Sequence, residues 1–229
     1  MPVNDLGQPI GEPVTWSGAR RPEATTLRGR CCSVVPLSVA HAPDLYAATA
    51  PLGAAHWTYL FWEAPADVSA MTDIIALFLG TPGWVPFAVL DPAGRAVGMC
   101  TYLRAEPGAG SIEIGAIVYG APLRRSTAAT EAMHLLARHA IDELGFRRYE
   151  WKCDALNEPS RNAALRLGFR FEGVFRQALI YKGRNRDTAW FAMTDTDWPQ
   201  IRAAHERWLD PTNFTAAGRA LTPLRVPSS

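Results

Sequence analysis

The chain has 229 residues, of which 48% are hydrophobic and 20% charged. This composition is typical of a folded protein with a sizeable core and argues against global disorder. The 23 Lys and Arg residues nearly balance the 22 Asp and Glu residues, so the formal net charge is +1. A near-zero net charge removes the main argument for nucleic-acid binding, which needs a net basic surface or a clear basic stripe, but it leaves room for a local basic pocket.

No apolar run approaches the roughly 18 residues of a membrane span, and Met1–Gly11 does not resemble a secretory signal. Of the four cysteines, Cys31 and Cys32 are adjacent, while Cys100 and Cys153 stand apart, so no pair has metal-ligand spacing. We therefore expect a cytoplasmic protein with free thiols, no metal, and no membrane or nucleic-acid partner.

The first part of the chain predicts an arm, a strand and two helices. Residues 1–30 are rich in Pro, Gly and Arg and have no periodicity, which indicates an extended arm held through Trp16 and Leu27. A strand is expected at residues 31–37. Helices are expected at His41–Ala50 and at Asp67–Leu79, where apolar residues recur at helical spacing.

The middle of the chain predicts three strands on short turns, namely Val85–Leu90, Ala96–Glu106 and Ser111–Tyr119. Such strands form an antiparallel meander. Helices and strands then alternate irregularly, which favours an α+β fold with a mixed sheet and helices on its faces over a doubly wound parallel sheet. The later elements are expected at Thr127–Leu144 (helix), Arg147–Asp154 (strand), Pro159–Leu167 (helix), Phe169–Val174, Gln177–Lys182 and Arg186–Met193 (strands), and Trp198–Trp208 (helix).

The junction between Tyr119 and the helix beginning at Thr127 is the first candidate site. Backbone N–H groups at a helix start have no intrahelical partner and lie at the positive end of the helix dipole, so they bind phosphate well. Small side chains follow Ser126, and Arg124 and Arg125 can add charge-assisted hydrogen bonds. A plain Ser or Thr cap beside two solvated arginines would give the same pattern.

The second candidate is the segment from Asp154 to Phe169, where Asn157 lies between a strand and a helix and Ser160 falls in the first helical turn. Either residue could act in a site, although an ordinary helix cap explains Asn157 equally well.

Taken together, these segments resemble the GNAT acyltransferase superfamily and, within it, the RimJ/RimL-like branch. The family's pyrophosphate loop is matched by residues 124–129, with Thr127 in place of the central Gly, and is followed by Thr-Glu-Ala at residues 130–132. The family's Asn-x-x-Ser is matched by Asn157 and Ser160. The remaining motifs are Leu167-Gly168-Phe169, Glu172-Gly173, Gly183 with Asp187, and Asp197-Trp198.

The resemblance implies a GNAT-like, mostly antiparallel central sheet with helices on both faces, acetyl-CoA as cosubstrate and a primary amine as acceptor. It also implies an oxyanion donor, the backbone N–H of Ile117 or Val118, and Ser160 as the group that assists the departing thiolate. The cofactor-binding residues that it implies are Val118, Tyr119, Arg124, Arg125, Ser126, Thr127, Ala128, Ala129, Thr130, Asn157 and Ser160.

The general base is left open between Glu113 and a chain of waters, and a solvated strand carboxylate is the alternative reading of Glu113. Glu131 is expected to favour the helix dipole or to pack against Arg124, and His134 is expected to be structural. The hairpin residues Arg184, Arg186 and Asp187 form either part of an acceptor site or a solvated turn. The aromatic residues Trp57, Tyr59, Phe61 and Trp62 form either an acceptor wall or plain core.

The expected organisation is an arm at 1–30, a GNAT acetyltransferase domain at 31–200, and a C-terminal helix and tail at 201–229. The acceptor is expected to be a protein N-terminus or a small-molecule amine, and the arm and the helix with Trp208 are candidate homodimer elements. Two alternatives stay open, a non-catalytic coenzyme A sensor suggested by Thr127 and an interaction module that uses no coenzyme.

Overall fold

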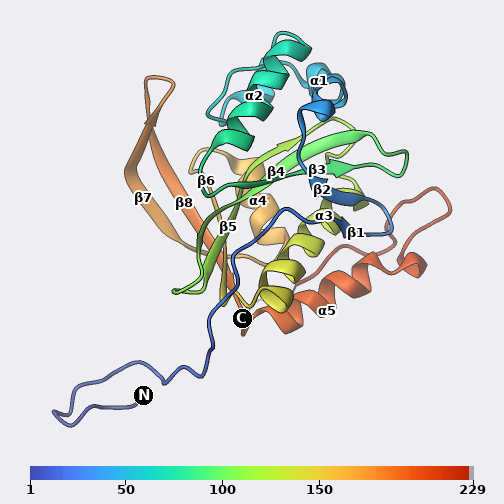
Figure 1. The fold of residues 1–229 in the computed structure, drawn as a ribbon. Coiled ribbons are helices and arrows are strands. Elements are labelled where there is room, and N and C mark those ends of the chain that lie inside the picture. Colours follow the sequence, from blue (N-terminus) through green and yellow to red (C-terminus); the bar gives the residue numbers. More distant parts are fainter. Residues whose placement is uncertain (227–229) are drawn as a thin grey trace.

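The computed structural model describes residues 1–226, which contain one eight-stranded sheet (Figure 1). Its strands lie in the order β1, β2, β3, β4, β5, β6, β8, β7, and every neighbouring pair is antiparallel except β5 and β6. The predicted meander is β3, β4 and β5, with the expected bounds. The strands are β1 (Leu27–Arg28), β2 (Ser33–Pro36), β3 (Val85–Leu90), β4 (Ala96–Glu106), β5 (Ser111–Tyr119), β6 (Arg148–Asp154), β7 (Arg170–Tyr181) and β8 (Arg184–Thr194).

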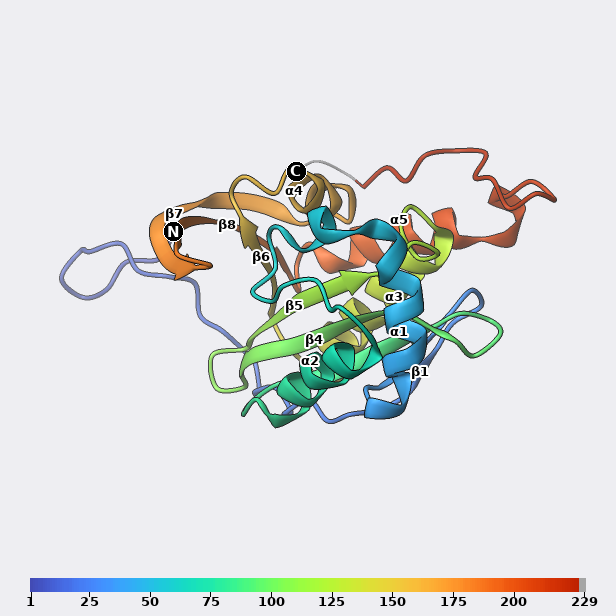
Figure 2. The same ribbon diagram turned by 90° about the horizontal axis from the view of Figure 1, so that it is seen from above.

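Helices cover both faces of the sheet, as Figure 2 shows, and each face has its own buried apolar cluster. Helices α1 and α2 pack on one face through residues such as Leu45 and Ile75, whereas α3 and α5 pack on the other through Leu136 and Ile201. The expected α+β class is therefore confirmed. The helices are α1 (Ala42–Thr49), α2 (Val68–Gly80), α3 (Thr127–Arg138), α4 (Glu158–Arg166) and α5 (Trp198–Leu209).

Strands β5 and β6 separate part of the way along their length, and this separation positions the site. Their parallel pairing runs from Ser111 only as far as Glu113, opposite Glu150, although both strands continue. Beyond that point β5 carries a β-bulge, with Ala116 and Ile117 opposite a single residue of β4. Ala116 adopts a φ of 49°, a left-handed conformation that costs a non-glycine residue about 1 kcal/mol.

Two predicted elements differ from the structure. The helix expected at Thr127–Leu144 is α-helical only to Arg138, and a π-helical segment, His139–Glu143, completes it. Close to the point where the α-helical part ends, the buried Tyr102 hydroxyl donates a hydrogen bond to the carbonyl of Leu136 at 2.5 Å.

The hairpin also differs, because the two strands expected between Phe169 and Lys182 form the single strand β7. Its register shifts near Gln177, which has a φ of 52° and donates its backbone N–H to the carboxylate of Asp187. The turn consists of Lys182 and Gly183, both at positive φ, so Arg184 already belongs to β8.

The N-terminal arm projects from the body in Figure 1 and reaches it through Trp16, whose Nε1–H donates to the carbonyl of Gly145 at 2.8 Å. Leu27 then pairs with β2. At the other end, Trp208 is buried and donates to the carbonyl of Thr222. The Trp208 side chain therefore packs within its own chain, and the helix that carries it stays a predicted dimer element. Residues 227–229 of the expected tail lie outside the described residues.

Candidate active site

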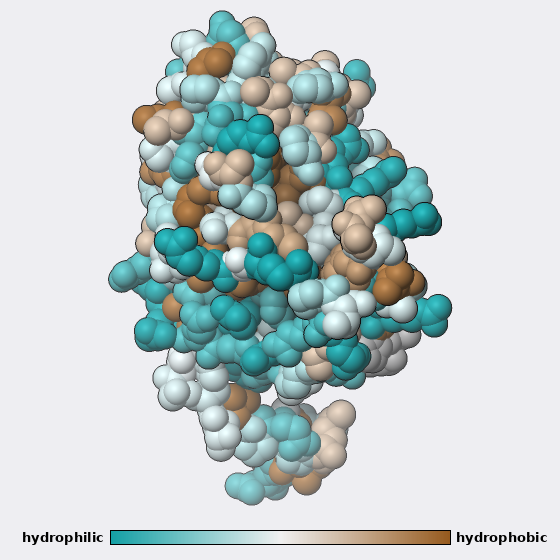
Figure 3. Space-filling model, turned by 90° about the vertical axis from the view of Figure 1, so that its right-hand side faces the viewer, coloured by the Kyte–Doolittle hydropathy of each residue, from teal (hydrophilic) through white to brown (hydrophobic). Residues whose placement is uncertain are grey.

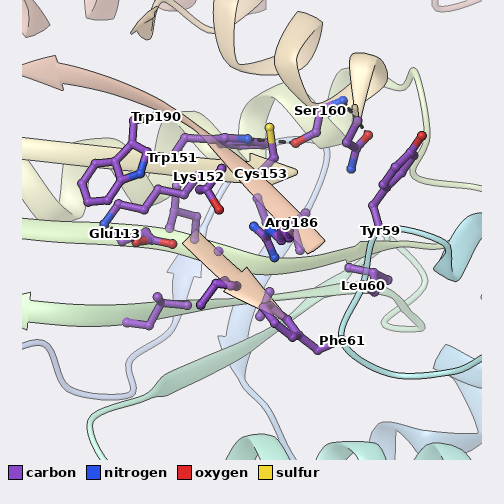
Figure 4. A pocket seen from close by; sticks show the side chains of 18 of the residues that line it. Tyr59, Leu60, Phe61, Glu113, Trp151, Lys152, Cys153, Ser160, Arg186 and Trp190 are labelled. Atoms are coloured by element: carbon purple, nitrogen blue, oxygen red, sulfur yellow. Dashed lines mark hydrogen bonds and ion pairs between the residues drawn. The ribbon is translucent and has the colours of Figure 1, made fainter. Parts of the chain in front are cut away.

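A cavity of about 440 Å³ opens where β5 and β6 separate. The backbone of β5 from Gly115 to Ile117 forms one side, and Trp151 to Cys153 of β6 form the other. Strands β7 and β8 and the segment between α1 and α2 close the remaining sides. The side chains labelled in Figure 4 therefore converge on the cavity from β5, β6, β8, α4 and the segment between α1 and α2.

The aromatic residues between α1 and α2 divide between the cavity and the core. Tyr59, Phe61 and Trp62 line the cavity, and Trp84, which was not singled out from the sequence, joins them. Trp57 is 2% exposed and belongs to the cluster under α1 and α2, so for Trp57 the core reading holds. Tyr59, Phe61 and Trp62 form one side of the cavity, which we call the aromatic wall.

Ser160 lies on the cavity wall, held by a short hydrogen-bonded unit. Its Oγ accepts a hydrogen bond from Trp151 Nε1 at 2.9 Å, which leaves the hydroxyl proton available to a ligand. The side chain of Asn157 caps α4 by accepting the backbone N–H of Ser160 at 3.2 Å. Asn157 therefore fixes the turn that presents Ser160. Burial raises the pKa of the neighbouring Cys153 thiol, which keeps it neutral.

Glu113 lies on the cavity lining but is not solvated, contrary to the alternative reading of the sequence, since it is 2% exposed. One carboxylate oxygen accepts from Arg104 at 2.7 Å, and the other lies 2.8 Å from Lys152. Lys152 also pairs with Glu150 at 2.7 Å and lies over the Trp190 ring. Both carboxylate oxygens are therefore occupied by cations, so the geometry does not favour Glu113 as the proton acceptor.

The start of α3 keeps part of its capacity to bind an anion. The Ser126 hydroxyl caps the helix by accepting the backbone N–H of Ala129 at 3.1 Å, which occupies one of the expected amides. Within residues 1–226, no hydrogen bond is recorded for the N–H groups of Thr127 and Ala128. Arg124 and Arg125 are both exposed beside them, and Arg125 has a φ of 57°.

The other expected cofactor-binding residues take different positions. Ile117 lines the cavity, whereas the Val118 side chain is fully buried in the core under α1 and α2, so only its backbone can face a ligand. Tyr119 is half-buried and packs against the core under α3. The Thr130 hydroxyl is buried and accepts from Arg166 of α4, so that side chain connects two helices.

Two polar residues of α3 serve the fold. Glu131 does not contact Arg124, one of its two expected roles, because its carboxylate accepts three backbone N–H groups in the turn between β1 and β2, those of residues 30, 31 and 32. His134 is buried beside Trp198 and His205, in agreement with the expected structural role.

The sequence did not single out Lys152, Thr188 or Trp190, which also line the cavity. The alternation of side chains along β6 and β8 could have placed these residues on one face of each strand. It could not have shown that this face borders a cavity. Of the three hairpin residues expected either in an acceptor site or in a solvated turn, Arg186 lines the cavity and is 7% exposed, whereas Arg184 and Asp187 do not line it.

Comparison with known proteins extends these observations. The family model of the acetyltransferase (GNAT) domain matches residues 33–170. A GCN5-related N-acetyltransferase from Brucella melitensis is 40% identical, with a TM-score of 0.88 over 92% of this chain and 96% of that chain. A GNAT-family structure from Chromobacterium violaceum is 36% identical, with a TM-score of 0.76 over 83% and 98% of the two chains.

The microcin C7 self-immunity acetyltransferase, solved in complex with acetyl-CoA and AMP, shares the fold at 19% identity, with a TM-score of 0.64 over 72% of this chain and 93% of that one. No curated protein matches the chain. No helix within residues 1–226 has the length and apolar character to cross a membrane. With its family model and its two relatives above 30% identity, the chain belongs to the GNAT acetyltransferase family and is an N-acetyltransferase.

Proposed function

We propose that the protein transfers an acetyl group from acetyl-CoA to a primary amine by direct attack in a ternary complex. The observation that carries this proposal is the opening between β5 and β6, where one cavity brings together the bulge of β5, Ser160 and the aromatic wall at Phe61. The two open N–H groups of Thr127 and Ala128, flanked by Arg124 and Arg125, suit the diphosphate of the coenzyme.

In the reaction, the amine nitrogen forms a bond to the thioester carbonyl carbon and the carbon–sulfur bond breaks. One proton passes from the amine to the coenzyme A thiol in the net change. The oxyanion that develops needs a preplaced donor, and the bulge at Ala116 and Ile117 directs backbone toward the cavity at that point. We assign the donor to the backbone N–H of Ile117 or Val118.

We assign Ser160 the role of hydrogen-bond donor to the departing thiolate. Because its Oγ accepts from Trp151 Nε1, its O–H is polarised, and the hydroxyl lies on the cavity lining beside the Cys153 thiol. The proton of the amine passes to water, since both oxygens of Glu113 are held by cations. An α-amine with a pKa of about 7.7–8.0 loses this proton far more readily than a lysine at about 10.4.

We place the chain in the RimJ/RimL-like branch on its loop, Asn157 and Ser160, the motifs near Gly168 and Gly173, and the hairpin. In the cell the expected compartment is the cytoplasm, where cysteines such as the buried Cys32 and Cys100 stay reduced.

The test is a thiol-release assay with acetyl-CoA and a panel of small amines and peptides with free N-termini, together with thermal shifts with acetyl-CoA. Turnover on at least one amine, with a slower rate in Ser160→Ala, is the expected result. A thermal shift with no turnover on any amine would favour the coenzyme A sensor suggested by Thr127. No thermal shift at all would favour an interaction module that uses no coenzyme.

A further inference from the structure

A buried cation without a direct ion pair in residues 1–226 lies in the cavity. Arg186 is 7% exposed, and within residues 1–226 no hydrogen bond or ion pair is recorded for any nitrogen of its guanidinium. Its guanidinium lies over two aromatic rings, with its central carbon 5.0 Å from the ring centre of Phe61 and 5.6 Å from that of Tyr181. Since a buried charge is normally paired, this guanidinium is arranged for a partner that the chain does not supply.

The nearby acids are engaged elsewhere. Asp154 is the acid whose charge acts most strongly on Arg186. Its two carboxylate oxygens accept hydrogen bonds from the Tyr181 hydroxyl at 2.7 Å and from the N–H of Leu156 at 2.8 Å. Glu113 is occupied by Arg104 and Lys152. Burial accordingly lowers the pKa of Arg186 from its ordinary value, although a guanidinium stays charged at neutral pH.

Two further donors without partners follow on the same face of β8. Successive side chains of a strand alternate between its faces, so residues 186, 188 and 190 share one face. The Thr188 hydroxyl and the Trp190 Nε1–H are both buried and have no hydrogen-bond partner in residues 1–226, and both residues line the cavity. Unpartnered buried polar groups are rare in native structures, and three on one cavity wall point to a polar ligand.

Figure 4 shows Arg186 in the middle of the cavity, with Phe61 on one side and Cys153 and Ser160 on the other. The guanidinium therefore lies between Phe61 of the aromatic wall and Ser160, the residue assigned to the departing thiolate. A single planar fork matches one carboxylate, which it can bind through two parallel hydrogen bonds. A doubly charged phosphate would keep an uncompensated negative charge among the aromatic rings.

We propose that the acceptor is a small amine that also carries a carboxylate, and that Arg186, assisted by the hydroxyl of Thr188, binds this carboxylate. This specificity rests on the proposed acetyl transfer. The carboxylate binds at Arg186, the amine points toward the bulge of β5 and Ser160, and an apolar side chain lies against Phe61 and Trp62. The Trp190 N–H remains for another polar group of the bound ligands.

The experiment compares amines in the acetyl-CoA assay. The panel contains α-, β- and γ-amino acids with small, aliphatic or aromatic side chains, and each amino acid is paired with its carboxamide. Phosphoethanolamine tests whether a phosphate can replace the carboxylate. The wild type should prefer the best amino acid over its carboxamide by at least about tenfold in kcat/KM. Arg186→Gln should remove this preference and Arg186→Lys should keep part of it. The matched control is Arg176→Gln, an exposed arginine of the same hairpin that does not line the cavity.

The KM for acetyl-CoA should change less than about threefold in Arg186→Gln. A raised KM for acetyl-CoA with an unchanged amine preference would assign Arg186 to the coenzyme and overturn the proposal, and so would a preference for the carboxamides or for phosphoethanolamine.

Binding of phenylacetate and of phenylacetamide, followed by tryptophan fluorescence, separates this proposal from acetyl transfer itself. If no amine is acetylated, the proposed function fails, but phenylacetate should still bind at least about tenfold more tightly than phenylacetamide, and only when Arg186 is present. Equal binding of the two compounds, or a preference that survives in Arg186→Gln, would overturn the carboxylate site.

Discussion

The indole Nε1–H of Trp151 donates to the Oγ of Ser160 at 2.9 Å and thereby connects strand β6 to the first turn of helix α4. This bond occupies an acceptor position of the hydroxyl and leaves its proton free. Ser160 is thus oriented as a donor toward the cavity before any ligand binds.

Replacing Ser160 by Ala should lower kcat by about 10- to 100-fold, because the departing thiolate loses its donor. The KM for acetyl-CoA should change little, since the hydroxyl is assigned to a charge that develops only during the reaction. Steady-state thiol release measures both parameters. Trp151→Phe, which removes the indole N–H but keeps an aromatic ring, should cause a smaller loss of kcat. Unchanged turnover in Ser160→Ala would remove Ser160 from the mechanism.

Replacing Glu113 by Gln should destabilise the protein rather than change its chemistry. The substitution weakens two ion pairs, one of them with the buried Lys152, and should lower the free energy of unfolding by about 1–3 kcal/mol. Urea unfolding measures the loss, and the pH profile of kcat/KM should keep its midpoint. A hundredfold slower variant with normal stability and a changed pH profile would instead identify Glu113 as the base.

Replacing Arg125 by Gly should have two opposite effects. Glycine fits the φ of 57° without strain, so the free energy of unfolding should rise by up to about 1 kcal/mol. Loss of the guanidinium beside the start of α3 should raise the KM for acetyl-CoA about 3- to 10-fold. Arg124→Ala is the matched control, with a raised KM and no gain in stability. Lower stability in Arg125→Gly would contradict the strain argument.

The stability of the protein should fall as the pH falls below about 6.5, because of His205. This ring is 1% exposed, and its burial among Trp198 and His134 lowers its pKa to about 3. Between these two values the unfolded chain binds a proton that the folded chain does not, so acid favours unfolding by up to about 1.4 kcal/mol per pH unit.

Thermal melts between pH 7.5 and pH 5 measure this effect, since the carboxylates Glu150 and Glu172, whose pKa values are lowered, lose their contribution only below that range. His205→Gln should give a flatter profile than the wild type. An equally steep profile in the variant would show that another group controls the stability in acid.

The meander and the α3 start could be predicted from the sequence because local signals determine them. The turn at Asp91–Gly94 and the apolar run after Val85 delimit β3 and β4, and a strand followed by small residues and a helix identifies a candidate anion site. The parallel pairing of β5 with β6 could not be predicted, because it joins segments separated by a whole helix. For the same reason, the missing counter-ion of Arg186 is visible only when the cavity is assembled.

The two apolar clusters support different parts of the site. Ser160 follows β6 and begins a helix anchored in the cluster under α3, whereas Phe61 and Trp62 belong to the segment beside the cluster under α1 and α2. The hairpin that carries Arg186 is largely exposed along β7. Figure 3 views the molecule from the side away from this hairpin, and on that face apolar and hydrophilic residues are interspersed. Substitutions in the aromatic wall or in the hairpin can therefore change which amine is acetylated without changing how acetyl-CoA binds. One fold can in this way acquire new acceptors.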